Sequence, residues 1–270
     1  MSILRNIKMF VFDMAGTTVN EKGLVYKTFL STFREFGIKI PPEDFVRFYG
    51  MEKSQVISDV VDMIPTVPEE NKEKIYNKFK VNLREAYSDE NNISPMRGSY
   101  KLFDMLREKN IKVCLNTGFD REMAEMVVEK MKFKNHIDDF VSSSEVSKGR
   151  PFPFMINELM KRHGIEDPRQ IIKVGDTTLD ILEGKNSGTL YQMAVLTGEE
   201  SKESLLRNSP THVFDDLENL TRFLSDGDPD RKGGTVTDDQ IEENTDNIVN
   251  GIYNYYTEKI SNNFFAQDYS

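Results

Sequence analysis

The stretch MFVFDMAGTTV, residues Met9–Val19, joins an apolar run to a group of small and polar residues. Four apolar residues in succession before an acidic one predict a short buried strand that ends at Asp13. In open α/β sheets, ligands bind beyond the carboxyl ends of the strands. Asp13, followed by Ala15, Gly16 and Thr17, therefore has a position suited to a binding or catalytic site.

A second segment, IIKVGDTTLD from Ile171 to Asp180, repeats this arrangement. Its apolar residues lead into Asp176, and Asp180 follows four residues later. Proteins hold Mg²⁺ with one or two carboxylates, together with phosphate oxygens and water. Two acidic strand ends in one sheet can therefore share a magnesium ion.

Two further segments supply a hydroxyl group and a cation. NTGF begins at Asn116 and presents Thr117, whose hydroxyl and neighbouring backbone can hold a phosphoryl oxygen. KGRPFP begins at Lys148 and places Arg150 on a loop, where it can pair with the same phosphate or with a nucleophilic carboxylate. Together the four segments contain the groups that metal-assisted phosphoryl transfer requires.

The order of the predicted elements indicates an α/β fold. Strands alternating with helices predict a Rossmann-like, doubly wound parallel sheet, to which we assign residues 1–19 and 95–225. Residues 20–94 have helical periodicity, with helices expected at 24–36, 43–48, 54–63 and 68–87, and predict an inserted all-helical cap. We expect hinges at 20–23 and 91–98, because a cap must move to admit substrate. Residues 226–270 are predicted to form a linker and an accessory C-terminal helix or tail.

The four motifs, in this order, resemble those of the haloacid dehalogenase superfamily of phosphotransferases over roughly residues 9–223. Within the superfamily, FDMAGTTV, GRPFPF and TGFDREMAEMV are most similar to the phosphonatase branch, the phosphonoacetaldehyde hydrolases and their relatives. The resemblance implies that Asp13 attacks phosphorus and forms an aspartyl phosphate, which water then hydrolyses.

The resemblance also implies which residues hold the metal and the substrate. Magnesium would be bound by Asp13, Asp176 and the carbonyl group of Ala15, with Asp180 binding it directly or orienting its water. The implied catalytic residues are Asp13, Lys53, Thr117 and Arg150. The implied substrate and phosphate contacts come from Gly16, Thr17, Lys53, Thr117, Gly118 and Arg150.

Ala15 is an informative departure from most of the superfamily. Ordinary phosphatases carry a second Asp there, which protonates the leaving alcohol and later activates water. The phosphonatases also have Ala at this position and use a cap lysine that forms a Schiff base with the substrate aldehyde. In YGMEKSQV, Gly50 and Lys53 match the Gly-x-x-Lys loop that carries this lysine.

The match around Lys53 is incomplete. Tyr49 and Val56 occupy positions where the phosphonatases have Met and His, and the linker at 22–26 lacks their Cys. Three interpretations follow. The first is a magnesium-dependent hydrolase of a small phosphorylated or phosphonate metabolite, and the second a true phosphonoacetaldehyde hydrolase that uses Lys53. The third is a catalytically weak binding or regulatory protein, because Ala15 removes the usual acid.

The composition of the chain argues against some classes of binding partner. The chain has 270 residues and a formal net charge of -10, which argues against a nucleic-acid partner. No apolar run has the length of a membrane span and no secretory pattern is present, so we expect a cytoplasmic protein without a membrane partner. The single cysteine, Cys114, lies in an apolar strand and excludes an intrachain disulfide. The sequence is compatible with a homodimer.

Overall fold

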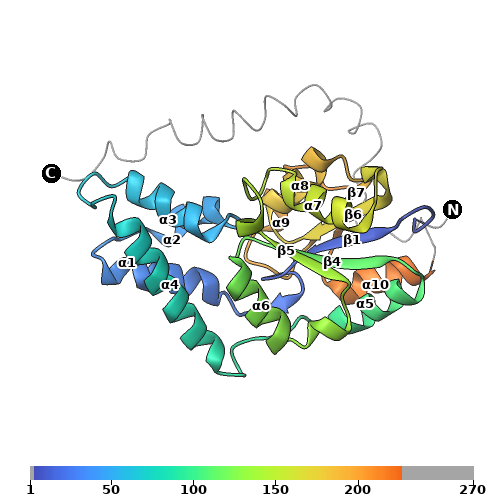
Figure 1. Cartoon of the computed structure of the whole chain (residues 1–270), viewed down its shortest axis with the longest axis horizontal. Coiled ribbons are helices and arrows are strands. Elements are labelled where there is room, and N and C mark those ends of the chain that lie inside the picture. Colours follow the sequence, from blue (N-terminus) through green and yellow to red (C-terminus); the bar gives the residue numbers. More distant parts are fainter. Residues whose placement is uncertain (1–2, 227–270) are drawn as a thin grey trace. The chain divides into compact units, whose positions relative to one another are not determined.

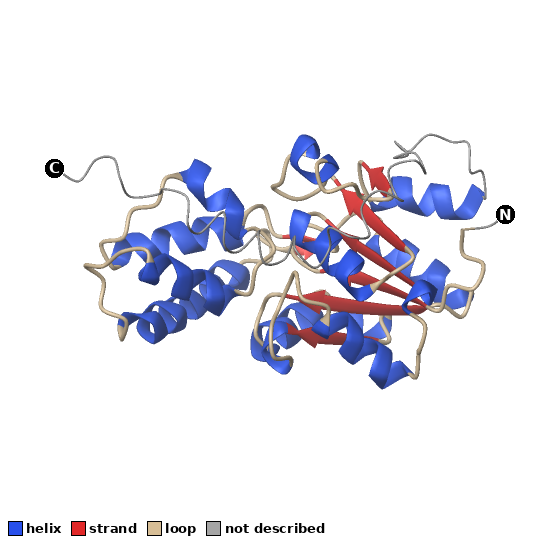
Figure 2. Ribbon diagram, turned by 90° about the horizontal axis from the view of Figure 1, so that it is seen from above, coloured by secondary structure: helices blue, strands red, loops and turns tan. Residues whose placement is uncertain are grey.

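Strand β1 (Met9–Asp13) lies inside a six-stranded parallel sheet in a computed structural model that describes residues 3–226 (Figures 1 and 2). The strand order is β5-β4-β1-β6-β7-β8. All five residues of β1 are buried, as a parallel sheet with helices on both faces requires. The other strands are β4 (Lys112–Thr117), β5 (Asp139–Ser142), β6 (Ile171–Gly175), β7 (Tyr191–Val195) and β8 (His212–Phe214).

Helices cover both faces of the sheet (Figure 1). One face packs against α7 (Phe154–His163), α8 (Thr178–Ser187) and α9 (Lys202–Leu206). The other packs against α5 (Ser99–Glu108), α6 (Arg121–Lys130) and α10 (Leu217–Asp226). Short 3₁₀ turns lie at Phe133–Asn135, Ser143–Glu145 and Pro168–Gln170. The predicted doubly wound α/β core is confirmed.

A group of four helices, here called the helical insert, lies between β1 and β4 in the chain. Its members are α1 (Leu24–Glu35), α2 (Pro42–Phe45), α3 (Lys53–Asp62) and α4 (Asn71–Ser88). Phe29 of α1 stacks on Phe79 of α4 with ring centroids 4.0 Å apart, and Phe45 packs on Phe29 at 5.4 Å. The predicted all-helical insertion is confirmed. The helix expected at 43–48 is instead α2 followed by a 3₁₀ turn at Val46–Phe48.

The two linkers of the helical insert pair with each other. β2 (Val19–Asn20) and β3 (Ser94–Pro95) form an antiparallel ribbon, and the Met96 backbone N–H donates to the Thr18 carbonyl over 2.8 Å. Strands of two residues have no detectable periodicity, so the sequence did not predict this ribbon. It holds the two ends of the insert side by side, while the hinge motion of the linkers stays a prediction.

Two other expectations concern single features. Cys114 is fully buried in β4, as its apolar surroundings predicted. Within residues 3–226, no helix is both long and apolar enough to cross a membrane. The helix or tail expected within 226–270 lies outside the described residues, apart from the last residue of α10.

Replacing Phe79 with alanine tests the aromatic core of the helical insert. We expect the Phe79→Ala protein to lose about 3–5 kcal/mol of unfolding free energy, because the change leaves a cavity against Phe29. Urea denaturation followed by circular dichroism measures this loss. Val81→Ala, at a 55% exposed position on the same helix, is the control and should change stability by less than about 0.5 kcal/mol. Equal losses in the two variants would contradict this packing.

Candidate active site

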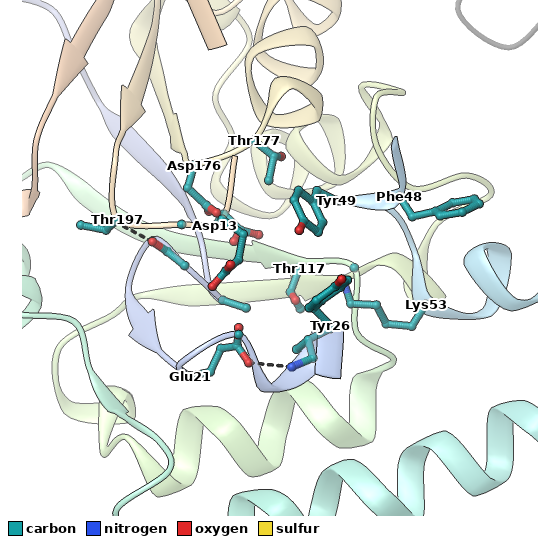
Figure 3. A pocket seen from close by; sticks show the side chains of 18 of the residues that line it. Asp13, Glu21, Tyr26, Phe48, Tyr49, Lys53, Thr117, Asp176, Thr177 and Thr197 are labelled. Atoms are coloured by element: carbon teal, nitrogen blue, oxygen red, sulfur yellow. Dashed lines mark hydrogen bonds between the residues drawn. The ribbon is translucent and has the colours of Figure 1, made fainter. Parts of the chain in front are cut away.

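Three adjacent strands deliver polar side chains to one cavity. Asp13 ends β1, Thr117 ends β4, and Asp176 follows β6 directly. All three line a cavity of about 220 Å³ that is closed on its other side by residues of the helical insert (Figure 3). Because β4 and β6 both pair with β1, the parallel register brings these residues together.

The carboxylates of Asp13, Asp176 and Asp180 form a buried cluster whose oxygens lie within 4.8 Å of one another. Burial raises the pKa of Asp13, and it raises that of Asp176 well above the usual range, with repulsion from the other two carboxylates adding to the effect. The Thr17 hydroxyl donates to Asp176 over 2.6 Å. Oxygen ligands with uncompensated buried negative charge are the environment that a hard divalent cation prefers. The cluster therefore fits such an ion.

Asp180 is held more firmly than the other two carboxylates. Its Oδ2 caps the start of α8 by accepting from the Thr177 backbone N–H over 3.2 Å, and it also accepts from the Thr177 hydroxyl over 2.6 Å. Its Oδ1 lies 2.8 Å from Lys173 Nζ and 3.2 Å from Arg150 Nε. Although burial opposes ionisation, the two cations hold the pKa of Asp180 below its usual range. Asp180 thus stays anionic and oriented.

A buried ion cluster lies behind these carboxylates. Glu183 of α8 contacts Arg150 Nε at 3.0 Å and Lys173 Nζ at 3.4 Å, and it accepts two hydrogen bonds from the Asn116 amide. Arg150 and Lys173 both donate to the Asn116 side-chain oxygen over 2.7 Å. Every charge in the cluster therefore has a partner, as buried ions require.

Asn116, Lys173 and Glu183 are functional residues that the sequence did not predict. One signal was available, because Lys173 interrupts the apolar run IIKVG and Glu183 follows Asp180 by three residues on α8. A charge inside a predicted buried strand requires a buried partner. Asp180 and Glu183, three residues apart on the next helix, were candidates for that partner.

Arg150 lies against the carboxylate of Asp13. Its Nη1 is 2.7 Å from Asp13 Oδ1, and its side chain is almost completely buried. Despite the burial, Asp13, Asp180 and Glu183 raise the pKa of Arg150, which is therefore a permanent cation. The sequence predicted that Arg150 pairs with a phosphate or with a nucleophilic carboxylate. The structure places the carboxylate of Asp13 in contact with it.

Lys53 brings the helical insert to the cavity (Figure 3). It is the first residue of α3, and its backbone N–H donates to the Gly118 carbonyl over 3.1 Å, while its ammonium group donates to the Met51 carbonyl. A Cβ on Gly118 would lie 2.5 Å from the Met51 carbonyl oxygen, so only glycine allows this approach. Burial lowers the pKa of Lys53.

The remaining predicted residues lie around the same cavity. Ala15, Gly16 and Gly118 line it, and the Thr117 hydroxyl accepts from the Phe119 N–H over 3.2 Å. Thr17 uses its hydroxyl on Asp176. The roles that the sequence predicted for these residues in binding phosphate or metal stay predictions.

Comparison with known proteins gives matches over most of the chain. The family profile described as haloacid dehalogenase-like hydrolase matches residues 10–194. A phosphonoacetaldehyde hydrolase from Bacillus cereus is 28% identical over 239 residues, which cover 82% of this chain and 89% of the relative.

Solved structures show the same fold. A hydrolase from Pseudomonas syringae has a TM-score of 0.72 and 20% identity, covering 81% of this chain and 98% of its own. A phosphonoacetaldehyde hydrolase-like protein from Oleispira antarctica has a TM-score of 0.67 and 22% identity, covering 83% and 95%.

Removing one cation from the buried ion cluster tests its importance for folding. We expect Lys173→Met to cost about 3–5 kcal/mol of unfolding free energy, because Glu183 and Asp180 would lose a buried partner. Lys112→Met is the matched control: Lys112 is half exposed at the start of β4 and pairs with Asp138, so its loss should cost less than about 1 kcal/mol. Chemical denaturation compares the two, and similar losses would show that the cluster contributes little.

Proposed function

Because the chain belongs to the haloacid dehalogenase-like hydrolases and is a phosphohydrolase, we propose that it hydrolyses a small phosphorylated or phosphonate metabolite with the help of Mg²⁺. The reaction would pass through an aspartyl phosphate on Asp13. The observation that carries this proposal is the position of Asp13, buried at the end of β1 between the guanidinium of Arg150 and the carboxylate of Asp176.

The groups around Asp13 support a division of roles. A carboxylate oxygen of Asp13 attacks phosphorus, and the bond from phosphorus to the leaving group breaks. Arg150, which contacts Asp13, offsets the negative charge that gathers as a phosphoryl group approaches. Thr117 faces the same cavity with a hydroxyl group suited to a phosphoryl oxygen.

The metal would be held by Asp13 and Asp176, with the Ala15 carbonyl and with Asp180 directly or through water. When bound, Mg²⁺ would neutralise phosphoryl charge and orient the substrate. Asp176 supports this assignment, because its carboxylate is buried and has the hydroxyl of Thr17 as its hydrogen-bond donor rather than a cation.

A true phosphonoacetaldehyde hydrolase is the second candidate, and Lys53 favours it. Its side chain lines the cavity together with Asp13, and the lowered pKa increases the share of neutral amine that can attack an aldehyde. The relatives named phosphonoacetaldehyde hydrolase support the same candidate. Tyr49 and Val56, which differ from the phosphonatase pattern, weigh against it.

Phosphate release separates the candidates. We expect the wild-type protein with MgCl₂ to release phosphate from phosphonoacetaldehyde or from some member of a panel of phosphomonoesters. Asp13→Ala should reduce this activity more than about a thousandfold, since it removes the nucleophile. Asp104→Ala, at a half-exposed position on α5, is the control and should leave the activity unchanged.

The response of Lys53→Arg then assigns the chemistry. Activity on phosphonoacetaldehyde alone, lost in Lys53→Arg and trapped by borohydride on Lys53 in the wild type, would establish the Schiff base. Ester hydrolysis that survives Lys53→Arg would establish a phosphatase. No release from any compound would contradict the hydrolase proposal and favour a binding or regulatory protein.

Metal binding can be tested apart from activity. We expect MgCl₂ to raise the melting temperature relative to EDTA, and Asp176→Asn to abolish this rise. In EDTA near neutral pH, Asp176→Asn should be more stable than the wild type. Because its pKa is raised in the folded state, ionised Asp176 destabilises the fold. The stability of the wild-type protein in EDTA should therefore fall as pH increases from the unfolded pKa of about 3.9 toward the higher folded value. A magnesium response that persists in the variant would show that Asp176 is not a ligand.

A further inference from the structure

The cavity contains one buried carboxyl group that the proposed reaction has not used. Among the described residues that line it, the acidic ones are Asp13, Glu21, Asp176 and Glu199. Asp13 is assigned as nucleophile, Asp176 belongs to the carboxylate cluster proposed to hold the metal and accepts from Thr17, and Glu199 is exposed to solvent. Glu21 is 7% exposed and remains without a role.

The local backbone places Glu21 in the wall of the cavity that Asp13 also lines, although it is eight residues beyond Asp13. The chain reverses immediately after Asp13, because the backbone N–H groups of Thr17, Thr18 and Val19 all donate to the Met14 carbonyl. The ribbon of β2 and β3 then fixes the outgoing chain, and Glu21 is the next residue. The side chain thus starts from a fixed point on the wall of the cavity.

The carboxyl group of Glu21 is anchored through one oxygen. Its Oε2 accepts from the Val25 backbone N–H in the first turn of α1 over 2.7 Å. Figure 3 shows the other oxygen on the side of the cavity where Asp13 lies. Glu21 can therefore exchange a proton through one oxygen while the other keeps it in place.

The electrostatic surroundings of Glu21 are suited to a group that carries a proton. Burial raises the pKa of Glu21, the hydrogen bond from the Val25 backbone and the charge of Lys53 oppose this rise, and the charge of Glu199 adds to it. Tyr87 of α4 is a further ionisable neighbour, and its own pKa is raised by burial and by Glu21. A carboxyl group with a raised pKa serves well as both acid and base near neutral pH.

We propose that Glu21 is the catalytic acid and base of this phosphohydrolase, in the role that a second aspartate in place of Ala15 would fill. This inference rests on the proposed function. As Asp13 forms its bond to phosphorus, the bond to the leaving oxygen breaks, and that oxygen takes the proton of the Glu21 carboxyl group. The resulting carboxylate then accepts a proton from water as the water oxygen attacks phosphorus. The Asp13–phosphorus bond breaks and phosphate leaves.

The dependence of rate on the leaving group tests the first step. Pre-steady-state release of the phenol would be measured with MgCl₂ for dinitrophenyl phosphate, whose leaving group needs no proton, and for phenyl phosphate, whose leaving group does. In Glu21→Gln, which keeps an acceptor for the Val25 N–H, release from phenyl phosphate should fall about 10²- to 10⁴-fold. Release from dinitrophenyl phosphate should change less than about threefold. Its steady-state rate should fall after a burst, because the base of the second step is missing.

Three further variants make the result specific. Glu21→Asp keeps a carboxyl group and should retain much of the wild-type activity on phenyl phosphate. Glu199→Gln, at the exposed carboxylate of the same cavity, should leave the leaving-group dependence unchanged. Lys53→Met tests the other proton donor, and a selective loss on phenyl phosphate in that variant rather than in Glu21→Gln would overturn the proposal.

The remaining outcomes are distinguishable. Equal loss on both substrates in Glu21→Gln, or no loss on either, would overturn the role of Glu21 while leaving the aspartyl-phosphate reaction intact. If the wild-type protein releases no phenol from either compound and no phosphate from phosphonoacetaldehyde or the phosphomonoesters, the proposed phosphohydrolase chemistry itself fails, and this inference fails with it. Activity on phosphonoacetaldehyde alone would overturn the role of Glu21, because a Schiff base on Lys53 would then replace the acid. Urea denaturation of Glu21→Gln establishes that the compared proteins are folded.

Discussion

The contact of Arg150 with three carboxylates is the interaction on which the rest of the site depends. The guanidinium group lies within 3.2 Å of oxygens from Asp13, Asp180 and Glu183, which come from a strand end and from one helix. Burying four charged groups is unfavourable unless each is paired, and the partners must hold their positions for the pairing to persist. The same constraint that keeps the charges compatible with a dry interior therefore fixes the nucleophile against the sheet. Lys173 and Asn116 complete the arrangement from the neighbouring strands.

The sheet and the helical insert contribute different chemistry to the cavity. The sheet provides carboxylates, a hydroxyl group and a cation at fixed positions, because parallel strands end at one edge. The helical insert provides Lys53 and an aromatic wall that includes Phe48 and Tyr49. The hydrogen bond from the Lys53 backbone to Gly118 joins the two parts next to Thr117. The nucleophile and the charged groups around it therefore come from the core, whereas Glu21 and Lys53 come from the segment between β2 and β3.

Sequence reasoning predicted the elements with strong periodicity and the residues at their ends. The strand ending at Asp13, the alternation of strands and helices, and the all-helical insertion all follow from local patterns, and the structure confirms them. The 3₁₀ turn at Val46–Phe48 and the ribbon of β2 and β3 were missed because they are too short to have a period. Glu183 was missed for another reason: its significance lies in contacts with Asn116 and Arg150, which are far away in the chain. Such partners emerge only when the fold brings them together.

The ribbon of β2 and β3 also marks the junction between the core and the segment inserted into it. The helical insert leaves and rejoins the core at Asn20 and Ser94, which are paired residues. A different segment whose ends have the same separation could join the core at this point, but it would lose the contacts that the insert makes with the core, such as those of Tyr76 and Lys80 with Asp120. Asp13, on the core side of the ribbon, would be retained in such a graft, whereas Glu21 and Lys53, which lie between Asn20 and Ser94, would be replaced. The nucleophile and the proposed acid and base thus lie on opposite sides of one junction, so a grafted segment would have to supply a new proton donor as well as new contacts with the substrate.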